Sequence, residues 1–177
     1  MSGHNKWSKI KRKKEITDAK KSKIFSKFAK LIAAESKKVN GNISSPTLKS
    51  VMEQAKSANM PAENILRAVK KGASADADTL EANIYEAYGP GGCGLIIETL
   101  TDNKNRTVAE IKHTLSKNGL VLGGIGSVIW GFAKKDSQWI PQNTIPLSEE
   151  NMEKTAKLID DLEDNDDVQE VFTNIAE

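Results

Sequence analysis

The distribution of charge along the chain is the feature that most restricts its architecture. Residues 1–72 contain 18 Lys or Arg against 5 Asp or Glu, whereas residues 73–177 contain 8 against 19. The basic residues stop at Gly72, and the segment that follows in "KKGASADADTLEAN" is small, polar and acidic, as linkers are. We therefore expect two domains, a basic one over residues 1–75 and an acidic one over residues 76–177.

The basic part predicts three helices behind an N-terminal arm. Thr17 or Asp18 can begin a helix that runs to about Val39 and ends at Asn40 and Gly41, and Pro46 and Pro61 introduce two more. Apolar residues at helical spacing predict that the three helices form a bundle. Inward-facing side chains are expected at Ile24, Phe25, Phe28, Leu31, Ile32, Val39, Leu48, Val51, Met52, Ala55, Ile65, Leu66 and Val69, with Gly72 closing the third helix.

The acidic part alternates strand and helix patterns. Extended segments are expected at "NIYEAY", "GLIIETLT", "GSVIWGFAKK", "WIPQNTIPL" and "DVQEVFTN". One helix is expected in "TVAEIKHTLSKNG", where Thr107 and Glu110 have capping-box spacing, and another from Ser148 to about Leu162. After the first strand the order is β-α-β-β-α-β, which predicts an α+β fold with a ferredoxin-like domain, an antiparallel sheet with helices on one face.

The glycine-rich stretch "GPGGCG", residues 89–94, raises the question of a nucleotide site. A phosphate-binding P-loop needs Gly-Lys-Ser/Thr followed by a helix. Here the apolar run "LIIETL" follows instead, and the next lysine is Lys104. Pro90 and Gly91 suit the two central positions of a type II turn, so we expect a hairpin between two strands.

The arm and the first helix carry the main signal for a polyanion partner. Their cations are dense, nearly free of acidic neighbours, and accompanied by two flat rings, which can stack on unpaired bases while lysines bind phosphate. The candidate nucleic-acid contacts are His4, Lys6, Trp7, Lys9, Lys11, Arg12, Lys13, Lys14, Lys20, Lys23, Lys27 and Lys30. Two alternatives stay open: Trp7 as a core residue of the bundle, and His4 as an ordinary surface residue. Solvated positions are expected for Lys37, Lys38 and Lys49.

Two weaker contact strips lie elsewhere. Asn64, Arg67 and Lys71 share one face of the third helix, although basic residues near a helix end also complement the helix dipole. Arg106 sits between a strand end and a helix start, where an exposed arginine and backbone amides can bind an anion. The alternative there is a polar loop in which Asn or Asp caps the helix.

The residues offer no catalytic or metal-binding pattern. The histidines are His4 and His113, the single cysteine is Cys93, and there is no HExxH motif. The acidic run at 160–167 lacks the ligand order of an EF-hand, so a solvated helix end is expected. No stretch approaches the roughly 18 apolar residues of a membrane span, and "MSGHNKWSKIKRKK" lacks the apolar core of a signal peptide. We expect a cytoplasmic protein that is not an enzyme and uses no cofactor.

Seven strings cover nearly the whole chain: "GHNKWSKIKRKK", "DAKKSKIFSK", "AKSANMPAENILRAVKKG", "YEAYGPGGCGLIIETLTDNKNRTVAEIKHTLSKNG", "GSVIWGF", "IPQNT" and "LIDDLEDNDDVQEVFTN". In this order they resemble the YebC/PmpR family, which includes the mitochondrial translational activator of cytochrome c oxidase subunit one. The resemblance implies a nucleic-acid-associated protein with a helical N-terminal domain and α/β domains. Bacterial members are described as DNA-binding transcriptional regulators, and also as ribosome-associated factors that help translation past proline-rich stretches.

The chain departs from the family pattern at one place. The pattern has a third, mostly acidic ferredoxin-like segment between the strands that match "GSVIWGFAKK" and "IPQNT", whereas only "KDSQ" joins them here. Because an insertion whose ends lie close together can be removed without unfolding its host, the second domain is expected to be complete without the missing segment, which the family pattern places between residues 136 and 140.

Three functional hypotheses follow. The first, favoured by the mixture of lysines and rings, is a ribosome-associated translation factor that binds ribosomal or transfer RNA and relieves stalling at proline-rich stretches. The second is a DNA-binding transcriptional regulator, for whose recognition helix only Asn64 and Arg67 are available. The third is a protein-binding adaptor whose acidic domain meets a basic partner. Reversing the charges of the arm should abolish function under the first two hypotheses and leave it unchanged under the third.

Overall fold

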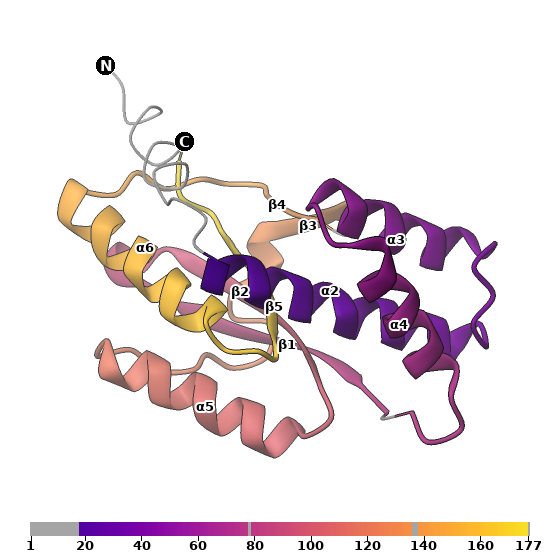
Figure 1. Ribbon diagram of the computed structural model, residues 1–177. Coiled ribbons are helices and arrows are strands. Elements are labelled where there is room, and N and C mark those ends of the chain that lie inside the picture. The colour runs from indigo at the N-terminus through magenta and orange to yellow at the C-terminus, as the bar shows by residue number, and fades with distance from the viewer. Residues whose placement is uncertain (1–17, 78, 136–137, 177) are drawn as a thin grey trace. The chain divides into compact units, whose positions relative to one another are not determined.

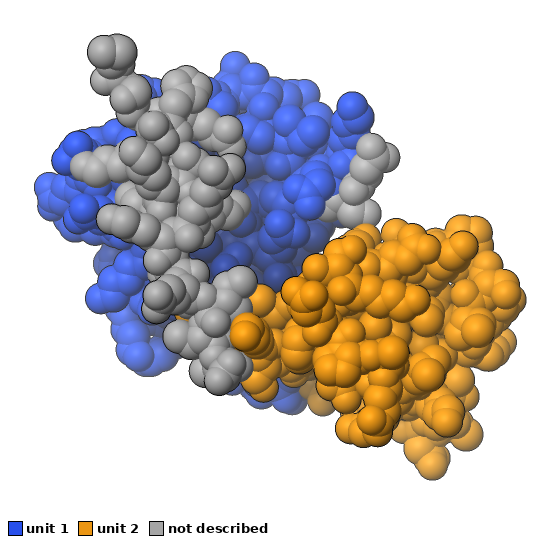
Figure 2. Space-filling view, turned by 45° about the horizontal axis from the view of Figure 1, so that its top comes forward, with its two compact units in different colours: residues 1–15, 82–99, 103–177 blue, residues 16–81, 100–102 orange. Residues whose placement is uncertain are grey.

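The computed structural model describes residues 18–77, 79–135 and 138–176, with helices first and a mixed region of strands and helices after them (Figure 1). This part of the chain divides into two compact units (Figure 2). The helical unit comprises residues 18–81 together with 100–102, and the α+β unit comprises residues 82–99 and 103–176.

The three predicted helices of the helical unit are confirmed. Helix α2 (Asp18–Lys38) ends where Asn40 and Gly41 adopt left-handed backbone angles, with φ of 50° and 76°. Helix α3 (Pro46–Ser57) begins with its proline in the first turn, where the missing N–H leaves no hydrogen bond unmade. Helix α4 (Ala62–Ala73) follows Pro61 directly.

The core of the helical unit is small and closely packed. Helix α2 packs against both α3 and α4, and Ser36 donates a hydrogen bond of 2.7 Å from its buried hydroxyl to the carbonyl oxygen of Val69 on α4. The buried side chains of this core are Ile32, Leu48, Ala55, Met60, Ile65, Ala68 and Val69. Burial of these apolar groups is the main force that holds three short helices together.

Two expectations for α4 are wrong. Leu66 is 49% exposed, because the buried stripe of α4 runs through Ile65, Ala68, Val69 and Gly72, and Leu66 lies one residue outside it. Gly72 does not end the helix. A Cβ atom at Gly72 would lie 2.2 Å from the carbonyl oxygen of Ala33 on α2, so this glycine lets the two helix backbones approach each other.

The main sheet of the α+β unit has three strands in the order β1-β2-β5. They are β1 (Glu81–Tyr88), β2 (Gly94–Thr101) and β5 (Val168–Thr173). Strands β2 and β5 are antiparallel, with Leu95 opposite Thr173 and Ile97 opposite Val171, and the register shifts between Glu98 and Thr99. All but one of the β2 side chains are buried, so both faces of the sheet must be covered.

The turn between β1 and β2 confirms the predicted hairpin. Gly91 has φ of 71° and ψ of 11°, the angles that the third position of a type II turn requires. Gly92 donates its N–H to the carbonyl oxygen of Gly89 at 3.0 Å, which closes the turn. The helix that a P-loop would need does not follow, since β2 starts at Gly94.

Different elements cover the two faces of the sheet. Helices α5 (Lys104–Lys117) and α6 (Glu149–Glu163) pack on the face that carries Leu95, Ile97 and Val171. The opposite face, with Ile96 and Phe172, meets a hairpin of β3 (Phe132–Lys135) and β4 (Gln138–Pro141), which is preceded by the short 3₁₀ turn η2 (Ile129–Gly131).

The α+β class and the β-α-β-β-α-β order after the first strand are confirmed. The pairing differs from a single sheet, because β1 occupies one edge of β2 and β3 pairs only with β4 in a second, two-stranded sheet. Two boundaries also differ. The strand expected over "GSVIWGFAKK" begins only at Phe132, and α5 begins three residues before Thr107 because Asn103 caps it, with Asn103 Oδ1 accepting the N–H of Arg106.

Candidate nucleic-acid interface

Four lysines of α2 lie on one side of the helix. Lys20, Lys23, Lys27 and Lys30 are spaced by three and four residues, which places them away from the face that carries Phe28 and Ile32 into the core. All four side chains are half-buried, and each already takes part in a polar or electrostatic interaction within the chain. A phosphate bound here would therefore join or replace existing contacts.

The lysines at the end of α2 have structural partners. Lys37 Nζ donates to the carbonyl oxygen of Ala77 at 2.8 Å and to Thr79 Oγ1 at 2.9 Å, which ties the end of α2 to the segment before β1. Lys38 pairs with Glu35 at 2.6 Å. The expectation of ordinary roles for these two lysines agrees with the contacts.

The strip predicted on α4 is weaker than its spacing indicates. Arg67 is exposed but pairs with Glu63, one turn earlier, at 3.0 Å. Asn64 is half-buried, and Lys71 is exposed with a partner of its own. An exposed pair at this spacing contributes only about 0.3–0.5 kcal/mol, so Arg67 could exchange Glu63 for a phosphate at small cost.

The contacts predicted on the arm lie outside the described residues. They are His4, Lys6, Trp7, Lys9, Lys11, Arg12, Lys13 and Lys14. They stay predictions, as do the two alternatives for Trp7 and His4.

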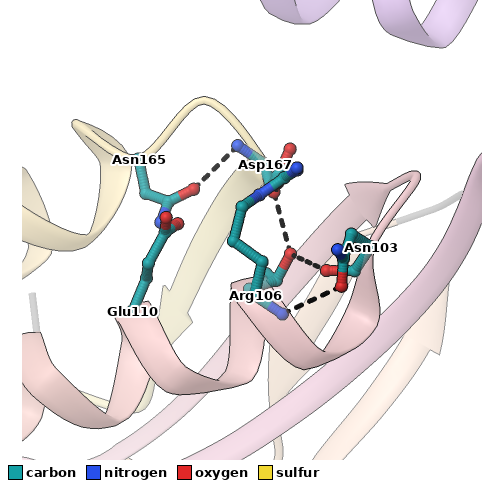
Figure 3. A network of polar contacts seen from close by, with 6 residues as sticks. Asn103, Arg106, Glu110, Asn165 and Asp167 are labelled. Carbon is teal, nitrogen blue, oxygen red and sulfur yellow. Dashed lines mark hydrogen bonds and ion pairs between the residues drawn. The ribbon is translucent and has the colours of Figure 1, made fainter.

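Arg106 belongs to a polar network at the start of α5 (Figure 3). Its Nη2 lies 2.7 Å from Asp167 Oδ2, and Thr107 donates its hydroxyl hydrogen to the same oxygen at 2.8 Å. The Asp167 N–H bonds to Asn165 Oδ1, and Asn165 Nδ2 donates to Glu110 Oε2 at 2.7 Å. The network joins the N-terminus of α5 to the loop between α6 and β5, which gives Arg106 a structural role whether or not it also binds an anion.

Asp167 corrects the expectation of a wholly solvated acidic run. Its side chain is only 4% exposed, although several of its acidic neighbours face solvent. A buried carboxylate needs charged or hydrogen-bonded partners, and Arg106 and Thr107 supply them from 60 residues away in the sequence. The sequence could not show this, because nothing local distinguishes Asp167 from Asp166.

Glu86 is a second buried carboxylate that the sequence did not reveal. Its Oε1 accepts the N–H of Gly126 at 2.6 Å, and its Oε2 accepts those of Val128 and Ile129, each at 2.7 Å. Burial by itself would raise the pKa of Glu86, but the three backbone donors outweigh it and lower the pKa below its ordinary value. The carboxylate therefore stays charged and holds the loop before β3.

Other reactive side chains of the described region have ordinary surroundings. Cys93 is buried, and burial raises the pKa of its thiol. His113 is exposed on α5. Among the described residues, no group of three or more His, Cys, Asp or Glu is placed to hold a metal ion. None of the described helices has both the length and the hydropathy of a membrane span.

Comparison with known families decides the relationship of the chain. The family model described as "TACO1/YebC protein N-terminal domain" matches residues 5–75. The model described as "TACO1/YebC second and third domain" matches residues 80–136 and 133–175. The chain belongs to the TACO1/YebC family. The resemblance seen in the sequence is thereby confirmed.

Individual relatives agree with this assignment. A "Probable transcriptional regulatory protein" of Caldanaerobacter subterraneus subsp. tengcongensis is 39% identical, over 99% of this chain and 98% of the relative. One of Syntrophobacter fumaroxidans is 42% identical, over 100% of this chain and 72% of the relative. The crystal structure of the conserved hypothetical protein Aq1575 from Aquifex aeolicus has a TM-score of 0.80 at 30% identity, over 92% of this chain and 93% of that one.

The alignment with the Caldanaerobacter relative also shows a difference in length. It extends over 238 positions, although this chain has 177 residues, so the relative carries residues with no counterpart here. The two matched ranges of the second family description overlap at residues 133–136, which include the last three residues of β3.

Proposed function

We propose that this protein is a nucleic-acid-binding regulator of transcription that binds DNA through its lysine-rich helical unit. The observation that carries the proposal is the combination of that unit with relatives named as transcriptional regulatory proteins. Residues 18–72 contain twelve Lys or Arg against four Asp or Glu. Such a surface attracts the DNA backbone regardless of sequence, which is the usual source of most of the binding free energy.

RNA is the second candidate target, and one observation favours it. A helix that reads the major groove directs its first turns at the bases, but Glu63 in the first turn of α4 is 83% exposed and pairs with Arg67. An exposed carboxylate at this place suits a DNA groove poorly. A ribosome-associated role in translation, with ribosomal or transfer RNA as the target, is the corresponding alternative.

A salt titration tests the helical unit as the contact surface. The variant Lys20→Ala/Lys23→Ala/Lys27→Ala/Lys30→Ala should bind duplex DNA more weakly than wild type. Its slope of log affinity against log salt concentration should be shallower by about 0.9 for each phosphate contact removed. Fluorescence anisotropy between about 50 and 300 mM salt measures both quantities.

A matched control separates contacts from net charge. Lys49, Lys56, Lys154 and Lys157 are exposed, so replacing these four by alanine removes the same charge from other surfaces. The control should keep the wild-type slope. Equal effects of the two variants would contradict a contact on α2. If reversing the charges of the arm leaves nucleic-acid binding unchanged, the protein-binding adaptor is favoured instead.

Ultraviolet crosslinking in cells then identifies the nucleic acid that the protein binds. Recovery of ribosomal or transfer RNA without DNA would favour a role in translation over one in transcription.

A further inference from the structure

Two exposed aromatic side chains of the α+β unit are fixed by one carbonyl oxygen. Tyr88 donates its hydroxyl hydrogen to the carbonyl oxygen of Ser127 at 2.6 Å, and Trp130 donates its indole N–H to the same oxygen at 2.9 Å. Trp130 is 69% exposed and Tyr88 48%. The polar ends of both rings are thus occupied while much of each residue is exposed to solvent. We call Tyr88 and Trp130 the aromatic platform.

The loop that carries the platform is held firmly in place. Glu86, two residues before Tyr88, accepts three backbone N–H groups from residues 126–129. The carbonyl oxygen of Glu86 accepts the N–H of Gly123 at 2.7 Å, and Ala87 forms a bridge with Leu122. A loop with a buried carboxylate and several backbone bonds loses little further entropy when a ligand binds, which is the condition for a preorganised site.

Both rings stay partly uncovered although their polar ends are bonded. Large aromatic side chains contribute most to binding when they are covered, and they are enriched at binding surfaces for this reason. Ile125, in the same loop, is fully exposed as well. The loop therefore presents apolar surface that the rest of its own unit leaves uncovered.

The charge of the surrounding sequence indicates the kind of partner. Residues 73–177 are strongly acidic as a whole, yet residues 111–135 contain no Asp or Glu. Two lysines follow on β3, of which Lys134 pairs with Glu98 at 3.0 Å and Lys135 is exposed. A flat apolar surface in a locally cationic segment complements a nucleotide, whose base stacks and whose phosphate is anionic.

We infer that the aromatic platform stacks unpaired nucleobases of the nucleic acid partner. The inference rests on the proposed function and extends it by a second contact, on the α+β unit, that is specific for single-stranded nucleotides. Stacking is tolerant of sequence because every base has a flat face. The platform would thus distinguish opened or single-stranded nucleic acid from a closed duplex.

The test compares three fluorescent probes of one length: a single-stranded oligothymidine, a duplex, and a single strand with abasic residues in place of bases. Trp130→Leu removes the ring but keeps an apolar side chain, and Trp130→Phe restores a ring. We expect Trp130→Leu to weaken single-strand binding about 10-fold or more and to change duplex and abasic binding less than about 2-fold. Trp130→Phe should recover most of the loss. The salt slope should stay unchanged, because a ring releases no counterions.

Ile140→Ala is the matched control, since Ile140 is 46% exposed and lies on β4. It should leave all three affinities unchanged. Equal single-strand affinity of Trp130→Leu and wild type would overturn the inference and leave the platform as a protein-docking surface. An equal loss on the abasic strand would overturn it too. Such results leave the proposed function intact if the α2 lysine variant still loses duplex affinity, whereas a wild type that binds no probe would refute both.

Discussion

At the level of single residues, Glu86 is a buried carboxylate that accepts three backbone N–H groups. Replacing it by Gln keeps the shape but removes the charge, and the new amide NH₂ group must face at least one backbone donor of residues 126–129. We expect Glu86→Gln to lower the free energy of unfolding by about 2–4 kcal/mol at pH 7. Urea denaturation followed by circular dichroism measures this loss.

The pH dependence of the same variant gives an independent check. Because the folded-state pKa of Glu86 lies below its ordinary value, the carboxylate stabilises the fold fully above that ordinary value and stops doing so as the pH falls through the lowered pKa. The difference between wild type and Glu86→Gln should therefore be constant from about pH 8 to 5 and shrink below about pH 4. Glu150→Gln removes an exposed ion pair with Lys154 and serves as the control. It should change the free energy of unfolding very little at any pH. A gap that widens in acid would contradict the assignment.

The buried carboxylates mark the limit of what single residues reveal in a sequence. Glu86 sits in an alternating strand pattern, where its position predicts a solvent-facing side chain, and its partners lie about forty residues away. Asp167 is paired with Arg106 across an even longer gap of 61 residues. In contrast, Gly91 was predictable because the turn angles depend on its immediate neighbours. Turn conformations can be predicted from neighbouring residues, whereas polar contacts between distant residues cannot.

At the level of elements, the contact of α2 with α4 depends on Gly72. Alanine is favoured over glycine inside a helix by up to about 1 kcal/mol. The new Cβ would lie 2.2 Å from the backbone oxygen of Ala33, and a backbone clash cannot be relieved by a rotamer change. Overpacking of this kind costs about 1–3 kcal/mol or more. We therefore expect Gly72→Ala to lower the stability of the helical unit by about 2 kcal/mol, measured by urea denaturation.

Gly124→Ala is the control for this substitution. Gly124 has no heavy atom within 4 Å of the position of an added Cβ, and its φ lies outside the left-handed region. It should change stability by less than about 0.5 kcal/mol. An equally small loss of stability in Gly72→Ala would contradict the conclusion that the backbones of α2 and α4 are in close contact at Gly72.

Helices and strands could be located from the sequence where the residues typical of helix ends and the spacing of apolar residues indicate the same element. Helices α2, α3, α4 and α6 begin at or directly after Asp, Pro or Ser residues of the expected kind. Most of the residues expected to face the core do so, but Ile24 on α2 and Leu66 on α4 are exposed. The strand expected from Gly126 failed at its first half because the N–H groups of residues 126, 128 and 129 bond to Glu86 instead of a neighbouring strand. The separation of the β3–β4 hairpin from the main sheet could not be foreseen either, since strand pairing depends on which sheet edges are still free.

At the level of the whole molecule, the chain combines a basic and an acidic part with a shortened second part relative to the Caldanaerobacter protein. The charge division was visible in the sequence, because net charge needs no knowledge of the fold. The four α2 lysines at positions 20, 23, 27 and 30 show the limit of that inference. Their number was evident, but their half-burial and existing contacts depend on packing that the sequence does not specify.

The difference in length predicts where the chain accepts an insertion. The family match breaks at residues 133–136, and the last pair of the β3–β4 ladder joins Lys135 to Gln138. New residues between these two positions leave every described strand bond in place and add mainly loop-closure entropy. A flexible Gly/Ser linker of about ten residues should therefore cost only about 1–2 kcal/mol of unfolding free energy. Thermal and urea denaturation of the inserted protein measure the cost.

The same linker between Gly126 and Ser127 is the decisive control. It would separate the N–H group of Gly126 from those of Val128 and Ile129, so Glu86 could not accept all three. A buried carboxylate that loses donors destabilises the fold by several kcal/mol, so this insertion should be far more damaging than the one in the hairpin. Equal damage at both places would mean that the hairpin is an integral part of the unit and that the residues missing relative to the family were not accommodated there.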